Sequence, residues 1–139
     1  MIDLAAEERL AIQDLIARYA FFTDQYQGEA WSQLFLEEGV LEGLPEPLVG
    51  REALAAKNVE LKEGPTEYRH FITNLYLESG AADRAVARAY GLVLDWALRP
   101  PSLAMFVEYR FDLVKRGGQW KIARVVVIRP YEGNGEGAR

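Results

Sequence analysis

The stretch Tyr68-Arg69-His70-Phe71-Ile72-Thr73-Asn74-Leu75-Tyr76-Leu77-Glu78 decides how the rest of the chain is interpreted, and it contains the only histidine. Successive side chains of a β-strand point to opposite faces. One face of a strand here would carry Phe71, Thr73, Leu75 and Leu77. The other would carry Tyr68, His70, Ile72, Asn74 and Tyr76. The first face suits packing against helices, whereas the second is typical of the wall of a polar-lined cavity.

His70 therefore has two interpretations. It is either an acid or base in that cavity, since histidine commonly serves in this way near neutral pH, or a structural histidine whose ring nitrogens are satisfied within the protein. The strand pattern alone leaves both open. The choice depends on which side chains from elsewhere in the chain reach this face.

Length and composition indicate one folded domain. The chain has 139 residues, 50% hydrophobic and 12% aromatic, which is typical of a packed core. The net charge of −5 and the lack of a basic run argue against nucleic acid as a partner. Without cysteine there are no disulfides or thiolate metal sites. We find no long apolar run and no signal-peptide pattern, so we expect no membrane contact and a cytoplasmic protein.

The first part of the chain is predicted to be helical. Residues 5–26 form one long helix with a wide apolar face, and Asp24 continues the four-residue spacing of Ile12, Ile16 and Ala20. A carboxylate on an apolar stripe is costly to bury unless it is paired. Asp24 is therefore either a paired, buried group or the cap of a turn before Gly28. Shorter helices are expected at 29–35 and 51–62, with a short strand at 39–43 and a proline-containing loop at 44–50.

From residue 67 onward the pattern changes to that of β-strands. We predict four long strands at 67–78, 83–98, 103–115 and 119–131, joined by short turns. Strands of this length imply a strongly curved sheet. The layout is α+β, with the N-terminal helices packed on one side of a mostly antiparallel sheet. Residues 1–131 form a single domain, and residues 132–139 are expected to be a flexible polar tail.

The strand at 83–98 has one face of small residues, among which Asp95 stands. Small side chains on a curved sheet leave space for a packed helix or for a ligand. Asp95 is then either a polar group near a ligand or an exposed aspartate close to a strand end, the commoner situation for aspartate.

Several of these residues together resemble a known family. They are Tyr19, Asp24, Trp31, His70 at a strand start, and the closing Gly118-Gln119-Trp120-Lys121-Ile122. The chain resembles the SnoaL-like branch of the nuclear transport factor 2-like superfamily over nearly its whole length. The pattern is most similar to scytalone dehydratase, bile-acid 7α-dehydratase and hexachlorocyclohexane dehydrochlorinase.

The resemblance implies a cone-shaped, half-open barrel whose cavity is closed by the N-terminal helix. It places the family's catalytic histidine on His70, its helix aspartate on Asp24 and a catalytic tyrosine on Tyr19. Asp95 falls near an acidic or histidine position on the following strand. The chain departs from scytalone dehydratase in having no second histidine, and in having Gln27 where that enzyme has a further aspartate. The substrate is therefore not transferable.

The residue chemistry agrees with a lyase, of the dehydratase or dehydrohalogenase type. A histidine–aspartate pair in an apolar pocket is a good general base, and a phenol can donate to an oxyanion or leaving group. No cofactor is expected, because phosphate-binding glycine motifs are absent and one histidine without cysteine makes a metal site improbable. The alternatives are an isomerase, a polyketide-cyclase-like enzyme, or a non-catalytic binding or oligomerisation module.

The predicted site has two parts. The catalytic residues are His70 as base, Asp24 as its orienting partner and Tyr19 as donor. The substrate-binding residues are Tyr26, Trp31, Tyr68, Asn74, Asp95, Met105, Val107 and Arg129. The expected substrate is a small hydrophobic or aromatic molecule. A homo-oligomer, dimer or trimer, is expected because the long strands present more apolar outer surface than three helices can cover.

Overall fold

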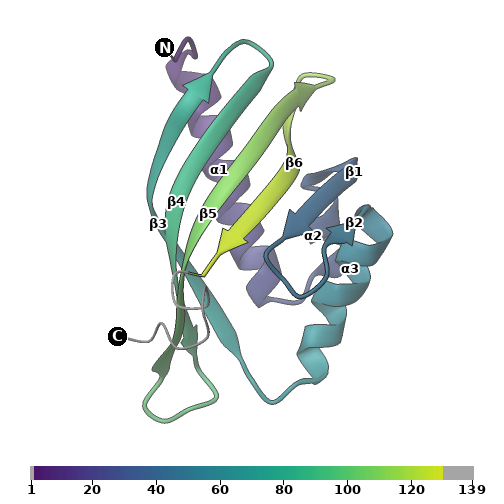
Figure 1. The fold of residues 1–139 in the computed structure, drawn as a ribbon, viewed down its shortest axis with the longest axis vertical. Helices are drawn as coiled ribbons and strands as arrows, with labels where there is room; N and C mark the ends of the chain where they lie inside the picture. Colours follow the sequence, from purple (N-terminus) through teal and green to yellow (C-terminus); the bar gives the residue numbers. More distant parts are fainter. Residues whose placement is uncertain (1, 130–139) are drawn as a thin grey trace.

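The structure is a computed structural model, in which residues 2–129 are described (Figure 1). The helices are α1 (Ala6–Asp24), α2 (Gly28–Ser32), α3 (Arg51–Glu60) and a short 3-10 turn at Leu61–Glu63. The strands are β1 (Phe35–Glu42), β2 (Leu48–Val49), β3 (Tyr68–Gly80), β4 (Arg84–Asp95), β5 (Ser102–Arg116) and β6 (Gln119–Ile128). The predicted α+β class and curved sheet are confirmed. The predicted tail at 132–139 lies outside the described residues.

All six strands form one sheet in the order β2-β1-β6-β5-β4-β3. The pairs β3–β4, β4–β5 and β5–β6 are antiparallel, whereas β1 pairs with β6 in parallel. The sheet curves without closing into a full barrel, and α1 crosses behind it while α2 and α3 stand at one side (Figure 1).

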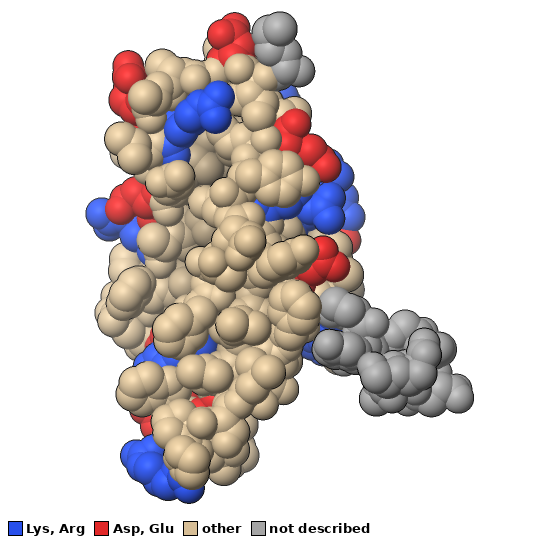
Figure 2. All heavy atoms as spheres, turned by 90° about the vertical axis from the view of Figure 1, so that its left-hand side faces the viewer, with Lys and Arg blue, Asp and Glu red and all other residues tan. Residues whose placement is uncertain are grey.

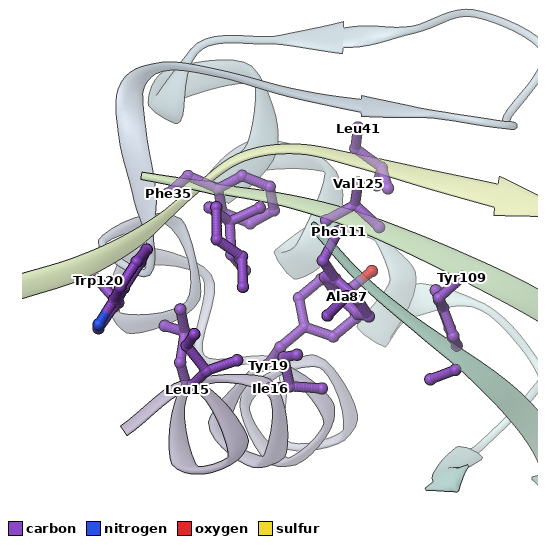
Figure 3. Packing of buried hydrophobic residues seen from close by; sticks show 14 of the residues in the cluster. Leu15, Ile16, Tyr19, Phe35, Leu41, Ala87, Tyr109, Phe111, Trp120 and Val125 are labelled. Carbon is purple, nitrogen blue, oxygen red and sulfur yellow. The ribbon is translucent and has the colours of Figure 1, made fainter. Parts of the chain in front are cut away.

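The core lies between α1 and the concave face of the sheet. The side chains that α1 buries recur at helical spacing; they are Ile12, Leu15, Ile16, Tyr19 and Ala20. Tyr19 packs edge-on against Phe111 of β5, with 5.5 Å between ring centroids (Figure 3). Full burial of each large apolar side chain contributes roughly 1.5–3 kcal/mol. The hydrophobic face of α1 therefore holds the helix on the sheet.

The small residues of β4 lie in this core. Ala85, Ala87 and Ala89 are buried, and Ala87 belongs to the same cluster as Tyr19 and Phe111. A Cβ atom on Gly91 would lie 2.5 Å from the ring of Tyr109. The small side chains of β4 thus make room for packed core side chains, including the aromatic rings of β5.

Two details of the predicted strands are wrong. Residues Leu48 and Val49, expected in a loop, form β2, because they lie beyond the prolines and pair with Leu41 and Val40 of β1. Phe35, expected in a helix, begins β1. Both differences come from strand pairing, which a local pattern does not reveal.

The alternation of β3 is regular up to Ile72, but the helices pack on the face of Ile72, not on that of Phe71 as expected, since Phe71 is 50% exposed. Beyond Ile72 the predicted alternation is wrong. Asn74 has a φ of 58°, in the left-handed region that asparagine tolerates. Between Thr73 and Tyr76, β3 advances by three residues while β4 advances by two, so β3 carries one extra residue. This bulge reverses the alternation. Leu75 then packs toward the core, and Tyr76 is 55% exposed.

Within residues 2–129, no helix combines the length and the hydropathy that a membrane span requires.

The convex face of the sheet carries exposed apolar side chains. Phe71 and Leu92 are exposed there, and with the half-buried Phe106 they are paired across β3, β4 and β5 in a row over that face. Seen from the β3 side, the lower half of the molecule is mostly uncharged (Figure 2).

Helices α2 and α3 touch at Gly28. A Cβ atom built on Gly28 would lie 2.5 Å from the carbonyl oxygen of Ala55 and 2.7 Å from a methyl of Val59. We expect Gly28→Ala to lower the free energy of unfolding by about 1–3 kcal/mol, since the two helices would have to separate. Thermal or urea unfolding measures this. Gly64→Ala is the control, because its nearest contact would be an ordinary 3.5 Å, and it should not lower stability.

The homo-oligomer expected from the sequence stays a prediction. We expect association through the convex face, and Leu92→Lys should convert the oligomer to a monomer without unfolding it, because a buried unpaired charge opposes association. Light scattering coupled to size exclusion measures the mass. Val49→Lys is the control, since Val49 is 63% exposed and lies on β2. A wild-type monomer at micromolar concentration would contradict the prediction.

Candidate active site

The sole histidine and the last residue of α1 are in direct contact. The Oδ1 atom of Asp24 lies 2.5 Å from Nδ1 of His70, and its Oδ2 atom accepts the backbone N–H of His70 at 2.9 Å. The side chain of Asp24 is 9% exposed and that of His70 is 17% exposed. Asp24 is thus a paired, buried carboxylate, one of the two possibilities left open by its position on the apolar stripe of α1, and it lies within hydrogen-bond distance of the His70 ring.

This geometry fixes the tautomer of His70. An ionised carboxylate can only accept hydrogen bonds, so Nδ1 must carry the hydrogen. In the neutral ring, Nε2 is then the nitrogen with a free lone pair. The backbone bond holds the carboxylate in place, so the ring and its partner are fixed at the start of β3.

His70 lines a cavity of about 190 Å³. All three helices, the 3-10 turn and all six strands contribute residues to its wall, which is mostly apolar. The lining residues are Tyr19, Thr23, Trp31, Leu41, Leu44, Leu48, Lys57, Asn58, Leu61, Tyr68, His70, Val93, Met105, Val107, Tyr109, Val127 and Arg129. The volume is below the roughly 300–1,000 Å³ of pockets for drug-sized ligands. The cavity therefore suits a small molecule.

The structure brings most of the predicted site together. The predicted residues that line the cavity are Tyr19, Trp31, Tyr68, His70, Met105, Val107 and Arg129. Asp24 does not line the cavity but contacts the His70 ring, which does. Arg129 directly follows β6. Three predicted residues do not line the cavity, namely Tyr26, Asn74 and Asp95.

Asp95 holds the chain at the end of β4. Its Oδ1 atom accepts the backbone N–H groups of Glu67 and Ala97 at 3.1 and 3.0 Å. The carboxylate is thereby used in joining the start of β3 to the turn after β4. This accounts for a buried aspartate on the small-residue face without a ligand.

Tyr26 and Asn74 do not line the cavity, and each has a backbone conformation in the left-handed region. Tyr26 has a φ of 55° just after α1, and its hydroxyl donates to the carbonyl of Thr66 at 3.5 Å. Asn74 lies in the bulge of β3 and faces a different surface hollow, beside Tyr76 and Arg88. A local sequence pattern does not reveal either left-handed residue.

Sequence reasoning missed four lining residues that carry polar groups, namely Thr23, Lys57, Asn58 and Tyr109. Tyr109 continues the alternation of Met105 and Val107 along β5, so the pattern was sufficient to find it. Asn58 follows Leu54 by four residues on α3, and both are buried. A lone asparagine on the apolar face of a helix is the signal that would have identified it.

Burial raises the pKa of two cavity phenols. The pKa of Tyr19 lies well above its usual value because of desolvation and the neighbouring Tyr109. The pKa of Tyr109 is raised by desolvation and by Asp24, against a smaller opposing effect of Arg129. Both phenols are therefore neutral hydrogen-bond donors throughout the neutral pH range. Among residues 2–129, no three His, Cys, Asp or Glu side chains are grouped so as to hold a metal ion.

A comparison with protein-family models matches residues 5–126 to the SnoaL-like domain. The chain belongs to the SnoaL-like domain family. The resemblance drawn from the histidine strand and the closing Gly118–Ile122 segment is thereby confirmed. The comparison with curated proteins gave no match.

Solved structures share the fold of this SnoaL-like domain. A function unknown protein from Mycobacterium tuberculosis is 28% identical with a TM-score of 0.85, over 95% of this chain and 77% of that one. A protein from Catenulispora acidiphila, solved in complex with S-DNPA, is 25% identical with a TM-score of 0.76, over 88% of this chain and 95% of that one. An NTF2-like protein with a cystatin-like fold from Novosphingobium aromaticivorans, 22% identical over 94% of this chain and 86% of that one, shows the same fold with a TM-score of 0.79.

The raised phenol pKa values predict a loss of stability at alkaline pH. The unfolded chain ionises its tyrosines near pH 10, whereas the folded state keeps Tyr19 and Tyr109 neutral. Their contribution to the free energy of unfolding is complete below pH 10 and is lost as the pH rises toward the folded pKa values, by up to about 1.4 kcal/mol per pH unit for each. Chemical denaturation at several pH values measures this, and Tyr109→Phe should flatten the decline. An equally steep decline in that variant would contradict the assignment.

Proposed function

We propose that the chain is a cofactor-independent lyase, of the dehydratase or dehydrohalogenase type, acting on a small hydrophobic or aromatic molecule. The observation that carries the proposal is the Asp24–His70 contact at the wall of a largely apolar cavity. A histidine held by a carboxylate and open to a cavity is the arrangement of a general base.

The proposed reaction begins at Nε2 of His70. This nitrogen takes a proton from a carbon next to an activating group, and the carboxylate of Asp24 stabilises the imidazolium that forms. Tyr19 lines the cavity and its raised pKa keeps the phenol neutral, which supports its proposed role as a donor to negative charge developing on the substrate. The electron pair of the broken C–H bond forms the new double bond, and the leaving group departs from the adjacent carbon.

The alternative functions use the same cavity. An isomerase or a polyketide-cyclase-like enzyme would use the same base and return the proton to another atom, and a binding module would use the cavity without chemistry. The similar protein from Catenulispora acidiphila was solved in complex with S-DNPA, which supports ligand binding by a protein of this fold. The dyad favours chemistry over binding alone, since an apolar ligand needs no buried charged pair.

Exchange of the α-protons of cyclohexanone in D₂O, followed by NMR, tests the base without knowledge of the natural substrate. We expect the wild-type protein to accelerate this exchange. His70→Ala and Asp24→Asn should each reduce the acceleration by roughly 10²- to 10⁴-fold. In Asp24→Asn the amide nitrogen donates to Nδ1, which leaves the hydrogen on Nε2 and removes the base. Asp14→Asn, the same change at an exposed position of α1, is the control.

Elimination is tested separately with 3-hydroxycyclohexanone, whose dehydration to cyclohex-2-enone is followed by ultraviolet absorbance. Exchange with elimination supports the lyase, and exchange without elimination favours the isomerase. Absence of both overturns an enzymatic role for the dyad.

The same variants should be nearly as stable as the wild type. His70→Ala keeps the backbone N–H that Asp24 accepts, so the end of α1 stays attached to β3. Catalytic polar groups in cavities usually lower stability rather than supply it. Thermal melts measure this, and a fall of several degrees in His70→Ala, with probe binding unchanged, would indicate a structural histidine instead.

A further inference from the structure

The formal charges on the cavity wall have one sign. Among the wall residues that the structure describes, Lys57 and Arg129 carry positive charge, and no aspartate or glutamate is present. The whole chain has 21 Asp and Glu against 16 Lys and Arg, so composition alone would favour negative charge there. Charges of one sign within apolar walls concentrate their field on a ligand of opposite charge. The mechanism proposed above uses neither cation.

Lys57 brings its charge to the cavity from α3. Its side chain is 38% exposed, and its ammonium lies 3.6 Å from the carboxylate of Glu60, whose side chain is 69% exposed. A solvent-exposed ion pair of this kind is weak. The ammonium has three N–H donors, so it can bind a second anion while Glu60 stays in place. Glu60 does not line the cavity.

Arg129 brings the second charge from the residue that follows β6. Its positive charge opposes the rise in the pKa of Tyr109, whereas the carboxylate of Asp24 adds to that rise. Tyr109 therefore lies within electrostatic reach of both Arg129 and the dyad, and it lines the same cavity. Burial keeps the phenol neutral, so its hydroxyl is a further donor beside the guanidinium.

The size and polarity of the cavity restrict the anion that fits. The cavity has a volume of about 190 Å³ and a mostly apolar wall, so its ligand is small and largely apolar. A guanidinium binds a carboxylate through two parallel hydrogen bonds. Phosphate sites commonly also use backbone N–H groups of glycine-rich turns, and no glycine is among the described wall residues. These features favour a carboxylate over a phosphate.

We propose that the substrate is a small carboxylic acid, whose carboxylate is bound by Arg129 and Lys57 while its apolar body extends toward His70. This assignment rests on the proposed function, because it takes the cavity as the substrate site, and it names the class of the substrate. The two cations are substrate-binding residues. They fix the charged end of the molecule, and the cavity wall then limits where its remaining carbon atoms can lie relative to the imidazole.

Benzoate and benzamide test the assignment, because the two molecules have nearly the same shape and only benzoate is charged. Their affinities for the full chain are measured by NMR titration near neutral pH. We expect benzoate to bind at least about tenfold more tightly than benzamide, since hydrogen bonds between charged partners are stronger than those of a neutral amide.

Removal of either cation should weaken benzoate binding. We expect Lys57→Met and Arg129→Met each to lower the affinity for benzoate about tenfold and to change that for benzamide by less than about twofold. Unchanged benzamide binding shows that the cavity is still formed, and Lys57→Met provides the test by itself if Arg129→Met does not fold. Arg124→Met is the matched control, because Arg124 is exposed, pairs with Glu42 and does not line the cavity. It should change neither affinity.

Several results would overturn the inference. They are equal affinities of the wild type for benzoate and benzamide, a preference for benzoate that survives Lys57→Met and Arg129→Met, an equal loss of benzoate binding in Arg124→Met, and no binding of either probe by the folded protein. Displacement of benzoate by an equal concentration of inorganic phosphate would overturn the choice of a carboxylate.

Failure of the proposed lyase gives a different result. Proton exchange of cyclohexanone and elimination are then absent from the wild type, while the preference for benzoate and its loss in Lys57→Met remain. If exchange or elimination occurs and benzoate shows no preference, the lyase or isomerase chemistry stands and the carboxylic acid assignment is wrong.

Discussion

The structure depends on one carboxylate that makes two bonds to one residue. Asp24 accepts both the ring N–H and the backbone N–H of His70, so a single side chain joins the last turn of α1 to the first residues of β3. A buried carboxylate is tolerated only where its oxygens are satisfied. The same contact that makes Asp24 acceptable in the interior also orients the imidazole toward the cavity.

The rest of the fold supplies the surroundings that this contact requires. Small residues on β4 make room for the rings that α1 and β5 bring into the core, and the tight approach at Gly28 sets α2 against α3. The cavity lies between the helices and the sheet, and residues of both line it. Its wall is mostly apolar, which strengthens the few hydrogen bonds that a ligand can make there.

The sequence predicted the parts of the site that depend on periodicity. Asp24 and His70 were found because one closes a helical stripe and the other stands on a strand face. Asn74 and Asp95 were assigned to the cavity because alternation was extended through a bulge and a strand end, where pairing and capping take over. Asn58 was not predicted although its helical spacing marks it, because the sequence does not show that α3 lies against the cavity.

The extra residue of β3 has a consequence for how chains can meet. β3 is the long edge strand of the sheet, opposite the two-residue β2. A regular edge strand offers a row of unpaired N–H and C=O groups to any other strand. The bulge at Asn74 breaks that row and adds local twist. A second chain therefore cannot extend the sheet in register along the whole of β3, and the feature that turns Leu75 inward also protects the protein against edge-to-edge aggregation.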